Sequence, residues 1–295
     1  PAFVADVAIH DGRIAALGPD LGSRGVEVID VSGLIVSPGF WDNHAHLVTL
    51  KLYPDAENFI RQGITTVLAP LHSQPQPWPL DVYMDDVRMA LNVGMFAGHT
   101  WIRERVIGLE NRPPTEPELE WMRALVDSTM QQGALGLSTG LEYVPAAYAD
   151  LDEVVELAKV AASYGGIYVT HMRDEGVRVI EAVQETLEVG RRAGIPVQIN
   201  HHKVTGAEQW GTTSRTLALL DSASAAEQEV VHDVYPYTAF STYSDLLFPS
   251  WVLADGPEAF AARVADPAIR ERLVSEMSTI YGQQTGPCPE SVQFR

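Results

Sequence analysis

Two histidines one residue apart, His44 and His46, have the residue type and spacing of metal ligands. In an extended strand, residues i and i+2 point to the same side, so the two imidazoles would face one point, as ligands of a shared ion must. Alone the pattern is weak, because two unrelated turn histidines give the same spacing. Its meaning therefore depends on which other side chains the fold brings near.

From residue 35 onwards, strand-like and helix-like segments alternate seven times. This alternation predicts a parallel sheet with helical crossovers, and seven or eight such units favour a (β/α)8 barrel over an open sheet. The predicted strands are 34–40, 64–68, 92–97, 134–138, 167–170, 195–200 and 229–235. The predicted helices are 54–62, 80–91, 116–131, 151–163, 176–193, 213–227, 257–264 and 267–280.

The first 36 residues have a different pattern, which predicts part of a small β domain, with the barrel at 37–295. Asp11-Gly12 is a hairpin turn signal between strand-like runs at 5–10 and 13–17. Two further short strands are predicted at 26–29 and 34–36.

Barrel enzymes place their catalytic groups at the C-terminal ends of the strands. Six of the nine histidines lie at or just beyond such a predicted end: His44, His46, His72, His171, His201 and His202. We therefore expect a metal site that includes His44, His46, His171 and His201. Adjacent residues His201 and His202 cannot both face the barrel centre while the strand is extended. His99, after the third strand, fits a role at the substrate and a structural role equally well.

Composition excludes several classes of partner. The net charge of −19 argues against nucleic acid and against an anionic membrane surface. No apolar run approaches the roughly 20 residues of a membrane span, and residues 1–6 lack the pattern of a signal peptide. The single cysteine, Cys288, suits a reducing compartment, so we expect a cytoplasmic protein. We also expect it to act on a small molecule and to be able to form homo-oligomers.

Several sequence blocks resemble a known family. The run from Pro38 to His46, PGFWDNHAH, is similar to the first-strand signature of the amidohydrolase superfamily. Four further blocks look like the N-acyl-D-amino-acid deacylases (D-aminoacylases): GALGLSTGLEY at 133–143, THMRDEG at 170–176, VQINHHK at 197–203 and DVYPYT at 233–238. The resemblance implies a TIM-type (β/α)8 barrel of the amidohydrolase type with a small flanking β-sandwich. It also implies zinc-dependent hydrolysis of the amide bond of N-acyl-D-amino acids, by attack of metal-activated water on the acyl carbonyl.

The resemblance assigns roles one residue at a time. His44 and His46 match ligands of the more buried metal position, and His171 and His201 match ligands of a second position. Lys203 and Tyr235 match groups that hold the substrate carboxylate, Ser241 a further carboxylate contact, and Tyr143 a pocket residue. Arg173 is another cation near the site, and it would bind substrate or form an internal ion pair with a neighbouring acid.

Two departures from the family change the expected site. His72 stands where the family has a cysteine that bridges two metals; a neutral imidazole bridges poorly, so the site would hold one or two zinc ions in an altered geometry. His72 or His99 would help stabilise the oxyanion. The family's general base is an Asp after the eighth strand, and no residue before Arg295 matches it. We therefore expect a fragment, with both barrel and β domain incomplete.

Two alternatives to the deacylase remain open. One is a cyclic-amide hydrolase of the dihydroorotase or hydantoinase type, which shares the metal chemistry. The other is a non-catalytic metal-binding fragment, favoured if the chain ends at Arg295.

Overall fold

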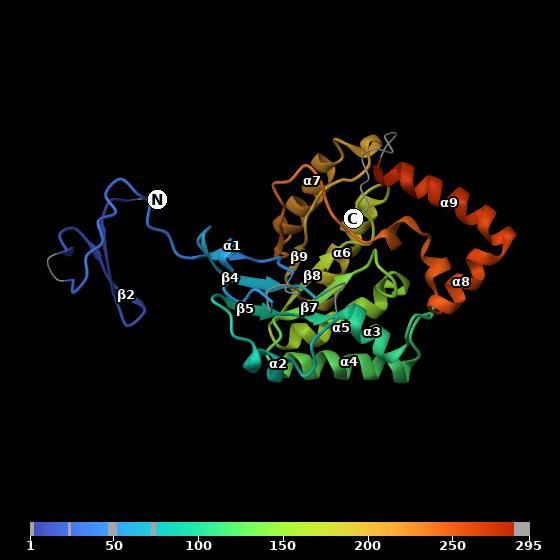
Figure 1. Ribbon diagram of the computed structural model, residues 1–295, viewed down its shortest axis with the longest axis horizontal. Coiled ribbons are helices and arrows are strands. Elements are labelled where there is room, and N and C mark those ends of the chain that lie inside the picture. Colours follow the sequence, from blue (N-terminus) through green and yellow to red (C-terminus); the bar gives the residue numbers. More distant parts are fainter. Residues whose placement is uncertain (1–2, 23–24, 47–51, 72–74, 286–295) are drawn as a thin grey trace. The chain divides into compact units, whose positions relative to one another are not determined.

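The computed structural model describes residues 3–22, 25–46, 52–71 and 75–285, and the chain divides into two compact units, Pro1–Gly39 and Phe40–Arg295 (Figure 1). The first unit contains an antiparallel hairpin of β1 (Asp6–His10) and β2 (Arg13–Gly18). Its turn residues Asp11 and Gly12 have φ of 49° and 70°, as the tight hairpin predicted here requires.

The strands predicted at 26–29 and 34–36 are wrong. Residues 25–39 contain no strand, and the apolar side chains of Val26, Ile29 and Ile35 are exposed. A strand needs a hydrogen-bonded neighbour, and in the described part of this unit only β1 and β2 pair. That the unit belongs to a small β domain stays a prediction.

The second unit is α/β, as predicted, and its strands are parallel. They are β3 (Phe40–Asp42), β4 (Ile64–Ala69), β5 (Asn92–Met95), β6 (Ala97–Gly98), β7 (Gly136–Gly140), β8 (Ile167–His171), β9 (Val197–Ile199) and β10 (Val230–His232).

The strands form two parallel sheets, in the orders β3-β4-β5 and β10-β9-β8-β7-β6. The sheets meet at Phe96, between β5 and β6, where Leu135 N donates to Met95 O at 2.8 Å just before β7 begins. Strand neighbours in space are thus strand neighbours in sequence, as in a barrel. Within the described residues, β3 and β10 end the row, and no strand pairs with their outer edges. The structure is therefore a partial (β/α)8 barrel.

Helices follow the strands: α1 (Glu57–Ile60), α2 (Leu80–Asp86), α3 (His99–Val106), α4 (Glu116–Gln131), α5 (Leu151–Ser163), α6 (Val179–Ala193) and α7 (Thr213–Ala225). Consecutive helices from α3 to α7 pack side by side against the strands (Figure 1). The helix α4 shows why: its buried residues recur at helical spacing on one face, Met122, Leu125, Val126, Thr129 and Met130.

After β10, the described residues form no further strand. The chain makes two short 3-10 turns and then α8 (Pro257–Ala265) and α9 (Pro267–Thr285). Among the described residues, no helix has the length and apolar character needed to span a bilayer.

Candidate metal and substrate site

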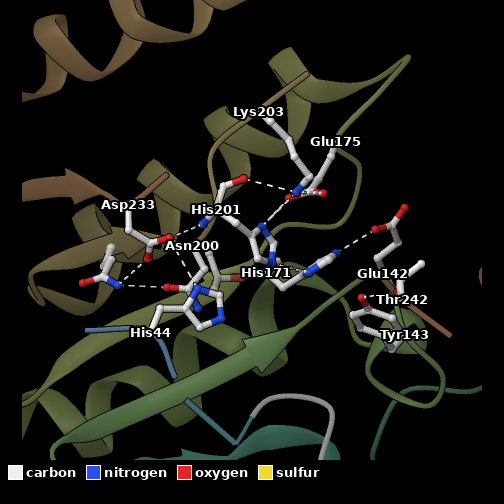
Figure 2. Close-up of polar contacts among 12 residues, drawn as sticks. His44, Glu142, Tyr143, His171, Glu175, Asn200, His201, Lys203, Asp233 and Thr242 are labelled. Carbon is white, nitrogen blue, oxygen red and sulfur yellow. Dashed lines mark hydrogen bonds and ion pairs between the residues drawn. The ribbon is translucent and has the colours of Figure 1, made fainter. Parts of the chain in front are cut away.

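Side chains from the C-terminal ends of five strands line one cavity of about 850 Å³. They follow β3, β7, β8, β9 and β10, where a barrel gathers its functional groups. Figure 2 shows the polar contacts among them. Of the residues predicted from the sequence, the cavity brings together His44, His46, Tyr143, His171, His201, Lys203, Tyr235 and Ser241.

The closest pair of histidines lies at the ends of neighbouring strands. His171 is the last residue of β8, and His201 lies two residues beyond β9. His171 Nδ1 is 2.8 Å from His201 Nε2, so these two nitrogens converge on one point (Figure 2). Together with Glu175 they form a set of three side chains whose ligand atoms all lie within 4.8 Å of one another. The two imidazole nitrogens that face each other fit a zinc ion, while Glu175 lies at the other ring nitrogen of His201.

A carboxylate lies beside the other ring nitrogen of each of these histidines. His171 Nε2 is 2.7 Å from Glu142 Oε2, and His201 Nδ1 is 2.8 Å from Glu175 Oε1. Such carboxylate–histidine pairs fix the ring and its proton, and they are typical partners of metal-ligating histidines. Burial is the main cause that lowers the pKa of His201 to about 4, so this ring is neutral near pH 7. Burial opposes ionisation of Glu175, but His171, His201 and Lys203 hold its pKa well below the usual range.

The first-strand histidines approach the same point from β3. The strand ends at Asp42, where the Asp42 carboxylate accepts from His44 N at 3.0 Å, so His44 and His46 follow the strand rather than end it. Their ring centroids are 5.5 Å apart, and that of His44 is 5.1 Å from His201. His44 Nδ1 lies 3.4 Å from Asp233 Oδ1, which also accepts from His201 N at 2.5 Å.

His201 and His202 point to different places because the chain turns sharply between β9 and Lys203. His201 has φ of 38°, a left-handed conformation that costs a non-glycine residue energy and often marks functional sites. His201 faces the cavity, whereas His202 packs outwards, with Nε2 2.9 Å from Thr216 Oγ1 on α7.

The predicted substrate groups lie on one side of the histidines. Lys203 Nζ forms an ion pair with Glu175 and lies 5.5 Å from the centre of the Tyr235 ring. The Tyr143 ring centroid is 4.7 Å from that of His171, and its hydroxyl is 2.9 Å from Thr242 Oγ1. Burial raises the pKa of Tyr143, which keeps this hydroxyl protonated. Ser241 also lines the cavity.

Two candidates lie away from this cavity, and a third cannot be placed. His99 is fully buried, with Nε2 2.8 Å from Glu153 Oε1, which packs it into the helical layer rather than toward the cavity. Arg173 binds Glu185 at 2.8 Å and donates to two carbonyl oxygens. It therefore forms an internal ion pair, but with an acid of α6 and not with the acids beside it in the sequence. His72 lies outside the described residues.

Three acids of the site, Glu142, Glu175 and Asp233, have no role among those predicted from the sequence. All three lie within the sequence blocks quoted above, each one to four residues beyond a strand or a histidine. That position is the signal that could have found them, since acids directly after parallel strands project towards the same edge. An isolated acid in a loop is otherwise typical of solvent exposure.

Comparison with known proteins gives a consistent result. No family model matches the chain. A D-aminoacylase of Alcaligenes xylosoxydans xylosoxydans is 39% identical over 269 aligned positions, in a match that covers 82% of this chain and 55% of that protein. An N-acyl-D-aspartate deacylase of the same organism is 38% identical, over 82% of this chain and 54% of its own length.

Among solved structures, the N-acyl-D-glutamate deacylase of Bordetella bronchiseptica, complexed with zinc and a phosphonate inhibitor, superposes with a TM-score of 0.71 at 32% identity. The match covers 79% of this chain and 54% of that one. The chain thus spans about half the length of the relatives it matches. The resemblance inferred from the sequence blocks is confirmed.

Proposed function

Because this chain belongs to the D-aminoacylase group of the amidohydrolase superfamily, we propose that it acts in the zinc-dependent hydrolysis of N-acyl-D-amino acids. The observation that carries the proposal is the convergence of His171 Nδ1 and His201 Nε2, 2.8 Å apart, beside the ammonium of Lys203. This arrangement supports the proposal because a metal held by the two nitrogens would lie next to a cation suited to a substrate carboxylate.

Zinc would be held by His171 and His201, with His44 and His46 serving the more buried position. When bound, zinc lowers the pKa of water from about 15.7 towards 7 and polarises a carbonyl group. The neutral state of His201 supports this assignment, since a ligating nitrogen must carry no proton. Whether one or two ions bind depends in part on His72.

The substrate would lie along the cavity with its carboxylate on Lys203. Tyr235 and Ser241 line the same side and would add hydrogen bonds, while the Tyr143 ring would pack against the acyl or side-chain atoms. Within the described residues, Lys203 is the only lysine or arginine that lines the cavity, which supports its assignment to the substrate carboxylate.

We propose that the general base is an aspartate outside the sequence blocks that match the family. The acids lining the cavity in the described part of the chain are Asp42, Glu142, Glu175 and Asp233. Each contacts a histidine side chain or backbone amide of the site. Their contacts suit them to orient the histidines.

A cytoplasmic location and assembly into a homo-oligomer are also proposed.

The test is an assay of the purified full-length protein, stripped of metal and then titrated with zinc. N-acetyl-D-amino acids, their L-enantiomers and hydantoins are offered in parallel, and amino-acid release is measured. We expect zinc-dependent release from the D-substrates and its loss in His171→Ala, with His10→Ala, an exposed histidine of the first unit, as the control. Ring opening of hydantoins without deacylation, or no release at saturating zinc, would overturn the proposal.

A further inference from the structure

Glu175 is a buried carboxylate that touches two residues with different proposed tasks. It is 4% exposed and lies in the loop after β8. Oε1 is 2.8 Å from Nδ1 of His201, a proposed metal ligand, while Oε2 forms an ion pair with Lys203, the proposed substrate anchor (Figure 2).

The backbone around Glu175 is itself held in place. Its carbonyl oxygen accepts from Thr205 N at 2.7 Å, which ties the loop after β8 to the loop after β9. On the N-terminal side, Asp174 Oδ1 accepts from Gly176 N and Arg178 N, each at 2.9 Å. The carboxylate is therefore presented by a fixed loop rather than by a mobile one.

Two groups compete for the same nitrogen of His201. Lys203 Nζ lies 3.0 Å from Nδ1, close to the 2.8 Å that separates this nitrogen from Glu175. An ammonium can only donate, so a bond from Lys203 to Nδ1 requires the ring proton to sit on Nε2. Nε2 is the nitrogen that faces His171, and a proton there would block metal binding.

We propose that Glu175 is a positioning residue that selects the metal-binding tautomer of His201 while keeping Lys203 in place for the substrate. One oxygen accepts the proton of Nδ1, which leaves Nε2 free for the metal. The other oxygen binds the ammonium of Lys203 and draws it from Nδ1. The inference rests on the proposed function, because it takes His201 as a zinc ligand and Lys203 as the carboxylate anchor.

Glu142 provides a matched comparison. It contacts His171 Nε2 at 2.7 Å, so it also orients a proposed ligand. Within the described residues, Lys203 contacts Glu175 and His201 Nδ1 and does not contact Glu142. Loss of either carboxylate should weaken zinc binding, because removing such an outer partner typically lowers metal affinity or activity about 10- to 100-fold. Only the loss of Glu175 should depend on Lys203.

The experiment measures zinc affinity by competition with a chromophoric chelator, which needs no catalytic activity. The variants are Glu175→Gln, Lys203→Met, the double variant, Glu142→Gln, and Glu142→Gln with Lys203→Met. We expect Glu175→Gln to bind zinc about 10- to 100-fold more weakly. Adding Lys203→Met should recover part of that loss, because the competing donor is gone. The same addition should recover nothing in Glu142→Gln.

Recovery in a double variant also shows that the single variant is folded well enough to bind. Wild-type affinity in Glu175→Gln, or no recovery on removing Lys203, would overturn the proposal. Nitrogen-15 spectra of the histidine rings, recorded on the metal-free protein, should place the His201 proton on Nδ1 in the wild type and shift it toward Nε2 in Glu175→Gln. Zinc binding without deacylation would refute the proposed function and leave this result standing.

Discussion

At the scale of single residues, histidine supplies the ligands, but neighbouring acids determine how each ring is used. His44, His171 and His201 each have a carboxylate near one ring nitrogen, from Asp233, Glu142 and Glu175 respectively. A free imidazole can carry its proton on either nitrogen, and these neighbours bias the choice. The nitrogen that remains points into the cavity.

Lys203 gives a prediction at this scale. Lys203→Met should lower kcat/KM for an N-acyl-D-amino acid about 10- to 100-fold, because a hydrogen bond to a charged group contributes about 1.5–3 kcal/mol. Most of the loss should appear as a raised KM. Steady-state kinetics on the free acid and on its carboxamide analogue separate the causes, since the analogue has no carboxylate to lose. An equal loss on both substrates would mean that Lys203 does not act on the carboxylate.

At the scale of elements, a buried charged cluster joins α3 to α5. Glu153, on the first turn of α5, contacts both His99 and Arg103 of α3, and all three side chains are excluded from solvent. Burial alone would raise the pKa of Glu153, yet His99 and Arg103 lower it below its ordinary value. The cluster explains why His99 serves the packing of helices rather than the reaction.

Removing one member of this cluster should destabilise the protein strongly. Glu153→Ala leaves the Arg103 guanidinium buried without its counter-ion, and such a change typically costs about 3–5 kcal/mol. Urea unfolding followed by circular dichroism measures the loss. Glu188→Ala, which breaks an exposed pair with Arg191 on α6, should change stability by less than about 0.5 kcal/mol.

A double variant tests the cause of that loss. Arg103→Met with Glu153→Leu should be less destabilised than Glu153→Ala, because no charge of the pair is left buried alone. A double variant as unstable as the single one would show that shape, not charge, determines the effect.

How far the sequence predicts an element depends on whether local signals or distant contacts set its ends. The helix predicted at 116–131 is correct, because Thr115 donates through both N and Oγ1 to Glu118, at 2.7 and 2.8 Å, and Gly133 follows the end. The helix predicted at 80–91 ends at Asp86 instead. Beyond the helix, Ala90 N donates to Pro54 O at 2.9 Å, and no local pattern reveals this distant partner.

At the scale of the whole molecule, the alternation of segments was sufficient to predict the order of the strands. It did not predict that the row would divide into two sheets at Phe96, which depends on backbone pairing between Met95 and Leu135. Histidine positions indicated the strand ends at which the cavity lies. The roles of its acids depend on side-chain partners far away in the sequence, which one sequence cannot reveal. The same holds for His99 and Arg173, whose partners Glu153 and Glu185 lie 54 and 12 residues away.

The contact between His44 and Asp233 joins the two extremes of the strand row. His44 follows β3, Asp233 follows β10, and their side chains meet although, in the part of the chain that the structure describes, no strand lies between the two edges. Zinc bound by His44, after β3, and by His171 and His201, after β8 and β9, would therefore act as a clasp between the two ends of the strand row. A ligand that binds only the folded state raises the free energy of unfolding by about 4 kcal/mol when its concentration is 1,000 times its Kd. The melting temperature should therefore rise when zinc is added and fall when a chelator is added. An unchanged melting temperature would mean that the clasp contributes nothing to holding the ring together.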